Sequence, residues 1–149
     1  MIKIQIPATS ANLGAGFDAL GLALTYYNYI EMEECDKIDI TAADGLDIPT
    51  DERNLIYISA KDLFAVCGKK LEGLRLIQTS NIPMARGLGS SSACIIAGLV
   101  GANKMLGDPL TKDDLVDLAA QIEGHPDNTA PALLGGIVTA VFDGRKVHW

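Results

Sequence analysis

The 149-residue chain is hydrophobic at 48% of its positions and charged at 21%, which is ordinary for a globular protein with a substantial core. Its formal net charge of −7 at pH 7 argues against a nucleic-acid-binding module, although one local site can still bind a nucleotide. Three widely spaced cysteines without a Cys-x-x-Cys pair indicate free thiols rather than a disulfide framework or a zinc site.

The first residues, MIKIQIPATS, have neither the long apolar core of a signal peptide nor the Arg-rich pattern of a transit peptide. The longest apolar stretch, around 93–102, contains glycine and is too short to span a bilayer. We therefore expect a cytoplasmic protein that binds neither a membrane nor a nucleic acid.

The first part of the chain predicts three strands. Apolar and polar residues alternate over 2–6, which is typical of a half-buried strand, and Pro7 is expected to end it. Turn-forming residues fill Thr9–Asp18. Leu20–Glu34 is rich in β-branched and aromatic residues, which predicts a second strand, and a short third strand is expected at Ile38–Ala42.

The middle of the chain predicts one helix and one strand. Apolar residues recur at steps of four, three and four from Ile56 to Cys67, which indicates a helix. We expect Asp51 to be its N-cap and Gly68 to stop it. Leu74–Thr79 is predicted to be a strand that leads into a glycine-rich segment and a further helix.

The last part of the chain predicts a helix followed by a hairpin. Thr111 and Asp114 form a capping-box-like start, and apolar residues over 115–122 form one helix face. Gly136–Phe142 is expected to be a strand, and an Asp-Gly turn with a return strand is expected over 143–149. The irregular alternation of strands and helices indicates an α+β fold.

The glycine-rich segment 83–94 reads PMARGLGSSSAC and allows three interpretations. A flexible linker is disfavoured, because a strand precedes the segment and an apolar helix follows it directly. A structural turn with a serine N-cap requires only one serine and one glycine. The third interpretation is an anion-binding loop, in which backbone N–H groups at a helix start, serine hydroxyls and the helix dipole all favour negative charge.

The known phosphate-binding patterns do not fit this segment. A Walker loop requires a lysine after the second glycine, and none follows Gly89. The dinucleotide-binding pattern requires a third glycine where Ser92 stands. The helix that follows is apolar on every side, so it must be buried, and we expect this to hold its N-terminus rigidly in the interior. The segment is therefore a phosphate loop of another design or no phosphate loop.

Two other stretches place polar side chains among glycines and prolines, over Pro7–Gly21 and Glu123–Gly136. Most such residues have ordinary roles, since a lone Asp or Asn is usually a turn former and His125 beside a proline is usually a surface residue. Glu123 is different, because the helix dipole disfavours a carboxylate at a helix C-terminus. A compensating cation is therefore expected near Glu123.

Together the three stretches resemble the three motifs of the GHMP kinase superfamily. PMARGLGSSSA resembles its Pro-x-x-x-Gly-Leu-Gly-Ser-Ser phosphate loop, and PATSANLGAGFDALGLAL and EGHPDNTAPALLGG resemble the homoserine kinases in particular. The resemblance covers nearly the whole chain and implies the N-terminal, ATP-binding domain of such an enzyme over 1–149. It also implies a fold like the second domain of ribosomal protein S5, with a left-handed β-α-β arrangement.

The resemblance implies that ATP and Mg²⁺ are bound and that the γ-phosphoryl group passes to the hydroxyl of L-homoserine. Asn54 matches a position near the adenine. The residues implied to surround the ATP phosphates are Pro83, Met84, Ala85, Arg86, Gly87, Leu88, Gly89, Ser90, Ser91, Ser92, Ala93 and Cys94.

The resemblance also implies metal and substrate ligands. Ser91, or Ser90 in its place, and Glu123 would hold Mg²⁺. Positions that contact the amino-acid substrate are matched by four residues, Asn12, Asp18, His125 and Asp127.

Asn128 matches the position of the catalytic aspartate of mevalonate kinase, so a clear general base is missing. Phosphoryl transfer depends mainly on alignment and charge neutralisation, and an aligned alcohol can lose its proton late. We therefore expect Asn12 and Asp18 to act by positioning the substrate.

The resemblance further implies a second, ferredoxin-like domain that is absent from these 149 residues. Without it the fragment is expected to be nearly inactive. An uncovered apolar face would then favour self-association, so a homodimer is compatible with the sequence. The alternatives are another GHMP kinase with a different small alcohol, or a non-catalytic nucleotide-binding or S5-like RNA-binding module.

Overall fold

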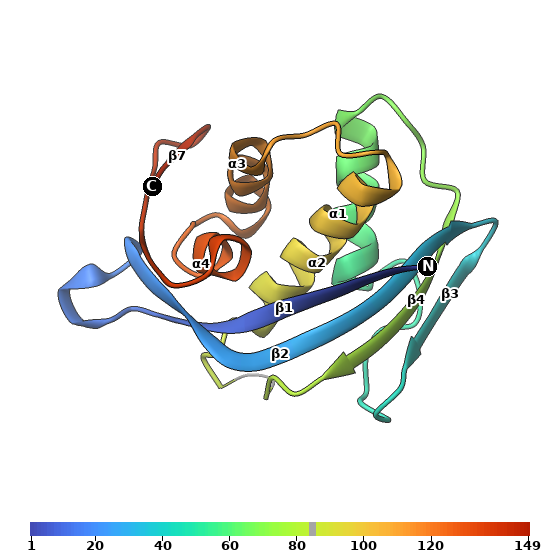
Figure 1. Ribbon diagram of the computed structural model, residues 1–149, viewed down its shortest axis with the longest axis horizontal. Helices are drawn as coiled ribbons and strands as arrows, with labels where there is room; N and C mark the ends of the chain where they lie inside the picture. Colours follow the sequence, from blue (N-terminus) through green and yellow to red (C-terminus); the bar gives the residue numbers. More distant parts are fainter. Residues whose placement is uncertain (84–85) are drawn as a thin grey trace.

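The main sheet of the computed structural model, which describes residues 1–83 and 86–149, contains five strands within those residues. They follow the order β1-β2-β4-β3, and β5 pairs with β2 (Figure 1). Met84 and Ala85, expected above to lie near ATP phosphates, are outside the described residues. The strands are β1 (Ile2–Ala11), β2 (Leu20–Cys35), β3 (Ile38–Ala42), β4 (Gly73–Ser80) and β5 (Ile137–Thr139).

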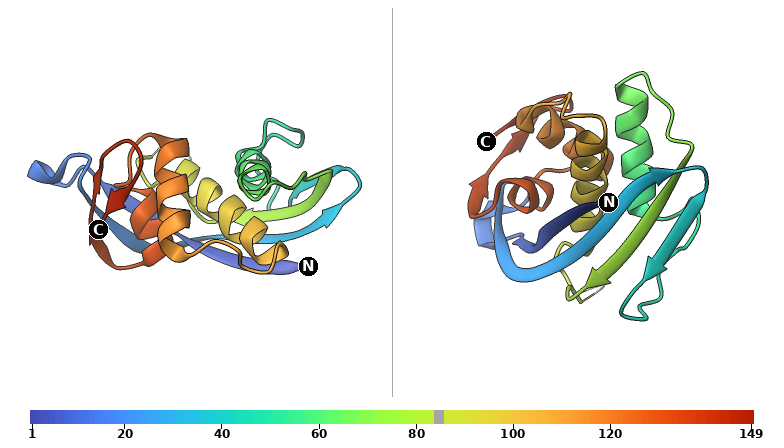
Figure 2. Two further views of the ribbon diagram at one scale, coloured as in Figure 1. Left: turned by 90° about the horizontal axis from the view of Figure 1, so that it is seen from above. Right: turned by 45° about the vertical axis from the view of Figure 1, so that its right-hand side comes forward.

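Four α-helices of the described chain cover one face of this sheet (Figures 1 and 2). They are α1 (Leu55–Val66), α2 (Ser90–Met105), α3 (Lys112–Glu123) and α4 (Thr129–Leu134). A short 3-10 helix, η1, spans Gly14–Gly16 between β1 and β2. The helix α1 connects β3 to β4, which pair in parallel, whereas the other strand pairs are antiparallel. The predicted α+β class is confirmed.

The first strand is longer than the sequence predicts. Pro7 was expected to end it, but β1 continues to Ala11 with a register irregularity between Pro7 and Thr9. The prediction is wrong because β1 is an edge strand, where a missing backbone donor and a local bulge are tolerated. The extra residues bring Thr9 and Asn12 to the side of the sheet where the glycine-rich segment ends.

Asn54, rather than Asp51, caps the first helix. The Asn54 Oδ1 atom accepts hydrogen bonds from the backbone N–H groups of Ile56 (2.9 Å) and Tyr57 (3.4 Å). Asp51 instead accepts from the backbone and guanidinium of Arg53, at the surface. The sequence pattern located the helix but placed its start three residues early, since both residues are good caps. The capping box of α3 is confirmed, with Thr111 and Asp114 bonded reciprocally.

The helix α2 has a buried body and an exposed beginning. Ile95, Ile96 and Leu99 are almost fully buried. A Cβ atom on Gly98 would overlap the Ile56 carbonyl oxygen, so glycine there permits close packing of α2 against α1. The predicted burial of the helix is therefore confirmed. Its N-terminus was expected in the interior, but Ser91 is exposed, so the helix starts at the protein surface.

The C-terminal part differs from the predicted single strand over 136–142. Ile137–Thr139 belongs to the main sheet, whereas β6 (Val141–Phe142) pairs with β7 (Val147–His148) in a separate hairpin. Ala140 lies between them and donates its backbone N–H to the Ala19 carbonyl oxygen. The helix α4 was not predicted, because its proline, Pro131, and the two glycines that follow the helix suggest a loop. A proline in the first turn of a helix removes no helical hydrogen bond.

Two further sequence expectations concern cysteines and membranes. The three cysteines are free thiols, as predicted. Among the residues that the structure describes, no helix is long and apolar enough to cross a bilayer.

Candidate functional site

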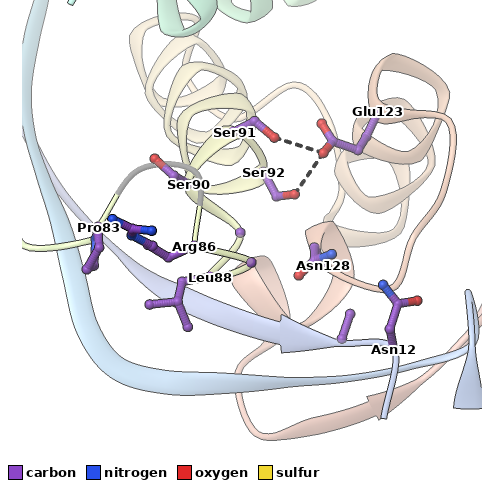
Figure 3. A pocket seen from close by; sticks show the side chains of 12 residues that line it. Asn12, Pro83, Arg86, Leu88, Ser90, Ser91, Ser92, Glu123 and Asn128 are labelled. Atoms are coloured by element: carbon purple, nitrogen blue, oxygen red, sulfur yellow. Dashed lines mark hydrogen bonds between the residues drawn. The ribbon is translucent and has the colours of Figure 1, made fainter. Parts of the chain in front are cut away.

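A pocket of about 370 Å³ lies at the N-terminus of α2 and joins the three polar stretches (Figure 3). The first stretch contributes Asn12, the glycine-rich segment contributes the greatest share, and the third contributes Glu123 and Asn128. Its described lining residues are Ala11, Asn12, Pro83, Arg86, Gly87, Leu88, Gly89, Ser90, Ser91, Ser92, Glu123 and Asn128. Segments more than a hundred residues apart in the sequence thus form one polar cavity.

The glycine loop has the backbone geometry of an anion-binding turn. Gly87 and Gly89 have φ angles of 69° and 64°, a conformation that residues with a Cβ atom rarely adopt. Gly89 is the N-cap of α2 and supplies no side-chain cap, so the first N–H groups of the helix have no side-chain partner from the N-cap. These donors and the positive end of the helix dipole lie at the pocket. Among the described lining residues, only Arg86 carries a cationic side chain.

Glu123 is held by hydroxyl groups. The Ser91 and Ser92 hydroxyls donate to the same carboxylate oxygen, Oε1, at 3.0 Å and 3.1 Å (Figure 3). Glu123 is the last residue of α3, and within the described chain it forms no ion pair with a lysine, arginine or histidine. The two hydroxyl donors partly offset the unfavourable helix-end position. The carboxylate and a serine hydroxyl form an oxygen donor pair at the edge of the phosphate pocket.

A metal site made of protein ligands alone is not present in residues 1–83 and 86–149, where no three His, Cys, Asp or Glu side chains gather at metal-binding distance. This is compatible with Mg²⁺, because Mg²⁺ is commonly held by one or two carboxylates together with substrate phosphates. The hard oxygen donors of Glu123 and Ser91 therefore fit Mg²⁺ bound to a nucleotide.

A second pocket, of about 330 Å³, adjoins the first and shares Ser90 and Ser91 with it. Its wall includes the apolar residues Leu46, Ile48, Pro49 and Leu55, together with polar atoms of Asn54 and Gln78. A mostly apolar cavity with a few polar groups is typical of a site for a planar base.

Asn54 has a structural role at this second pocket. Besides capping α1, its Nδ2 atom donates to the Pro49 carbonyl oxygen at 2.9 Å. The side chain is buried and joins the start of the helix to the loop that forms the pocket wall. An effect of Asn54 on nucleotide binding would therefore act through this loop, and direct contact with adenine stays a prediction.

Cys94, the last residue of the predicted phosphate loop, lines the second pocket rather than the first. Burial raises the pKa of its thiol to about 11, and hydrogen bonds from Gln78 and Asn28 oppose this only partly. Ala93 is fully buried and lines neither pocket. The phosphate-loop prediction thus divides into pocket residues and residues that pack behind them.

Three residues predicted to bind substrate do not line the first pocket. Asp18 is exposed, with a φ of 56°, in the segment between β1 and β2 that projects from the body (Figure 1). His125 and Asp127 form a pair, with Nδ1 of the histidine 2.6 Å from Oδ1 of the carboxylate. Asp127 is buried and the histidine side chain is partly exposed. Of the four predicted substrate contacts, only Asn12 lies at the pocket.

Sequence reasoning missed Thr9. This residue is fully buried, and its hydroxyl donates to Asn128 Oδ1 at 2.9 Å. Its backbone N–H donates to the Leu88 carbonyl oxygen at 3.1 Å. The sequence gives one signal for Thr9, which is its place in the polar stretch Pro7–Gly21. Its partners, Leu88 and Asn128, lie too far along the chain to form a local pattern with it.

The fold and the site define a class: an α+β domain whose glycine loop, at the start of a buried helix, forms a phosphate-sized anion pocket. Comparison with known proteins gives the family. Residues 54–136 match the model of the GHMP kinases N terminal domain. The chain belongs to the GHMP kinase family.

The curated relatives include homoserine kinases from Carboxydothermus hydrogenoformans and Caldicellulosiruptor bescii, which are 49% and 46% identical across 100% of this chain. The chain spans about half the length of these curated relatives, 50% and 49% respectively. The resemblance to homoserine kinases predicted from the motifs is confirmed.

Comparison with solved structures gives the same family. A homoserine kinase from Cytophaga hutchinsonii is 32% identical, with a TM-score of 0.81 over 99% of this chain and 50% of that one. A mevalonate kinase structure, 19% identical over 99% of this chain and 55% of that one, has a TM-score of 0.74 and shares the fold alone.

Proposed function

We propose that this chain is the nucleotide-binding part of a homoserine kinase, which transfers the γ-phosphoryl group of ATP to the hydroxyl of L-homoserine. The observation that carries the proposal is the first pocket. Its anion-binding loop, the Glu123 carboxylate and the Asn12 and Asn128 amides meet around one cavity. The names of the relatives support the choice of substrate, since two homoserine kinases match the whole chain.

The two adjoining pockets fit the two ends of ATP. The phosphates would occupy the first pocket, against the backbone N–H groups of 87–92, and the base would occupy the second. Ser90 and Ser91 line both pockets, so the two pockets adjoin and one nucleotide would extend across them. Arg86 would add positive charge beside the phosphates, which is useful in a chain with a net charge of −7.

Glu123 and Ser91 would hold Mg²⁺. When bound, Mg²⁺ would neutralise phosphate charge and so lower the barrier to transfer. The chain prepares this arrangement by keeping the carboxylate of Glu123 within hydrogen-bonding distance of the Ser91 and Ser92 hydroxyls. Its second oxygen, Oε2, accepts no hydrogen bond from the described residues and is free to bind a cation.

The remaining predicted residues act by alignment. Asn12 lies at the pocket and would contact the reacting hydroxyl, while Asp18 would contact the substrate ammonium group from the projecting segment. His125 and Asp127 would complete the substrate site from the third motif. Asn128 cannot accept a proton as a carboxylate can, so we propose that the alcohol loses its proton late in the transfer.

We propose further that a second, ferredoxin-like domain completes the enzyme, that the protein is cytoplasmic and that it forms a homodimer. The second domain would close the substrate site and supply cationic groups for the carboxylate of homoserine. Arg86 faces the phosphate pocket and is the only arginine in the three motifs, which supports this division of roles.

A coupled assay of ADP release tests the activity. The full protein that contains this chain would be supplied with ATP, Mg²⁺ and, in separate reactions, L-homoserine, mevalonate, shikimate or galactose. We expect turnover with homoserine to exceed the others by at least about a hundredfold, since a site built for an ammonium and a carboxylate leaves charges unpaired with the wrong alcohol. Greater turnover with another alcohol would overturn the choice of substrate.

A comparison of lengths tests the domain proposal. The 149-residue chain should release ADP with homoserine negligibly, while the same sequence joined to a segment matching the second half of its relatives should turn over. Weak ATP binding by the short chain, measured by calorimetry, would show that its loop is intact. Comparable turnover by both proteins would mean that residues 1–149 contain the complete site.

A further inference from the structure

We propose that Thr9 is a positioning residue that fixes the side-chain amide of Asn128, so that its NH₂ group faces the phosphate pocket. The inference rests on the proposed function, because it assigns Asn128 the role of a hydrogen-bond donor to the phosphoryl group in transfer. It also explains why a threonine is buried at the junction of the three motifs.

Thr9 makes three contacts that join these motifs. Its backbone N–H donates to the Leu88 carbonyl oxygen at 3.1 Å, which ties β1 to the glycine loop. Its hydroxyl donates to Asn128 Oδ1 at 2.9 Å. A Cβ atom on Gly89 would overlap the Thr9 hydroxyl oxygen, so the loop can approach Thr9 only because residue 89 is glycine. Thr9 itself is fully buried, which keeps the hydroxyl in one environment.

The hydrogen bond from Thr9 sets which end of the amide is available. With Oδ1 occupied, Asn128 presents the two N–H donors of Nδ2. No acceptor in the described part of the chain hydrogen-bonds to Nδ2, and Asn128 lines the pocket, where Figure 3 shows it between Asn12 and the glycine loop. Oδ1 lies against Thr9 and the Gly89 side of the loop, so Nδ2 is the end of the amide left to donate to a ligand in the pocket.

This orientation matters for phosphoryl transfer. Negative charge is spread over the phosphoryl oxygens in the transition state, and a fixed N–H donor stabilises it. If the amide turned by 180°, Oδ1 would face those oxygens and repel them. The turned state is disfavoured, because the buried Thr9 hydroxyl would lose Oδ1, its only hydrogen-bond acceptor among the described residues. Asn128 thus contributes although it cannot be a base.

Kinetics of the full protein that contains this chain test the role. Thr9→Val keeps the shape and removes the hydroxyl, and we expect it to lower kcat at least about tenfold with less than a threefold change in the KM for ATP. Thr9→Ser should restore most of the activity. Thr129→Val is the matched control, since Thr129 is also fully buried and adjacent to Asn128 but its hydroxyl faces the Pro126 carbonyl oxygen.

A double-mutant cycle separates positioning from general packing. In an Asn128→Ala background, Thr9→Val should have little further effect on kcat, because the group that it positions is gone. An equally large loss in that background would overturn the proposal, as would failure of Thr9→Ser to restore kcat. A Thr129→Val variant as slow as Thr9→Val would also overturn it.

Nuclear magnetic resonance of the same protein gives a readout independent of the substrate. With asparagine-selective ¹⁵N labelling, inorganic tripolyphosphate should shift the side-chain NH₂ signals of Asn128 in the wild-type and Thr9→Ser proteins but much less in Thr9→Val. A protein that shows these shifts yet ignores homoserine would disprove the proposed function and leave the positioning role standing. Unshifted Asn128 signals in the wild-type protein would overturn the positioning role, even if Thr9→Val did not fold.

Discussion

The Ser91 hydroxyl lies 3.0 Å from Glu123 Oε1, so the first turn of α2 is joined to the last residue of α3 at the edge of the phosphate pocket. This contact connects two motifs that are 32 residues apart. It places a negative charge next to loop donors that would bind phosphates, which is favourable only if a cation lies between the carboxylate and the phosphates. The contact therefore supports the proposed Mg²⁺ site.

Replacement of Glu123 by glutamine tests that site. Glu123→Gln keeps the shape and can still accept hydrogen bonds from the serines, but it removes the charge that would offset the cation. We expect kcat of the full protein to fall at least about a hundredfold, while metal-free ATP binding, measured by calorimetry, changes little. Near-normal turnover of the variant at low Mg²⁺ concentration would exclude Glu123 as a metal ligand.

The two loop glycines should differ in their tolerance of alanine. Both have positive φ angles, which cost an alanine about 1–2 kcal/mol. A Cβ atom on Gly87 would meet nothing within 4 Å, whereas one on Gly89 would collide with Thr9. Gly89→Ala should therefore lower the free energy of unfolding more than Gly87→Ala does in urea denaturation, and should weaken ATP binding more.

The predicted collision between Thr9 and an alanine at residue 89 can be tested by removing the Thr9 hydroxyl. Thr9→Ala takes away the hydroxyl oxygen that an alanine Cβ at residue 89 would strike, so Thr9→Ala with Gly89→Ala should be less destabilised than the sum of the single changes. The structure shows that a side chain at residue 89 would strike the wall formed by Thr9. Strictly additive losses would contradict this.

The cap of α1 gives a further prediction. Asn54→Ala removes the acceptor for two helix N–H groups, and we expect a loss of about 1 kcal/mol in the free energy of unfolding. It also frees the Pro49 carbonyl oxygen, so the wall of the second pocket should loosen and the affinity for ATP should fall. Asp51→Ala is the control, because among the described residues the Asp51 side chain bonds only to the exposed Arg53. Equal losses in both variants would contradict the assignment of the cap.

Local signals in the sequence predicted much of the fold. The capping box of α3 and the short strand at Ile38–Ala42 depend on neighbours in the chain, and the structure agrees with both. The start of α1 was misplaced because Asp51 and Asn54 are equally good caps, and only burial selects Asn54. Pro7 was misjudged because its effect depends on whether its strand lies at a sheet edge. That property is set by the whole topology.

The candidate site was predicted as motifs rather than as geometry. The glycine pattern and the family resemblance identified the loop, and Glu123 was noticed because a helix end disfavours its charge. The partners of these residues could not be read from spacing. Thr9 and Asn128 are 119 residues apart, and their hydrogen bond exists only because α4 packs against β1 and β2.

The second pocket gives the last prediction, through Cys94. Burial disfavours the thiolate and raises the pKa of Cys94 from 9.0 to about 11, so at pH 8 roughly one molecule in a thousand carries the reactive thiolate. Alkylation by iodoacetamide, followed by mass spectrometry, should therefore be slow at pH 8 and accelerate about tenfold per pH unit toward pH 10.

The same shift has a consequence for stability. The folded protein retains the Cys94 proton more firmly than the unfolded chain does, so this contribution to stability is complete below about pH 9 and is lost as the pH rises toward about 11. Because Cys94 lines the second pocket with Ser90 and Ser91, saturating MgATP should slow its alkylation at least about fivefold. Cys35 and Cys67 are partly exposed, as Cys94 is, but do not line this pocket, so they serve as internal controls. Alkylation of Cys94 at an unchanged rate with ATP bound would place the base outside this pocket.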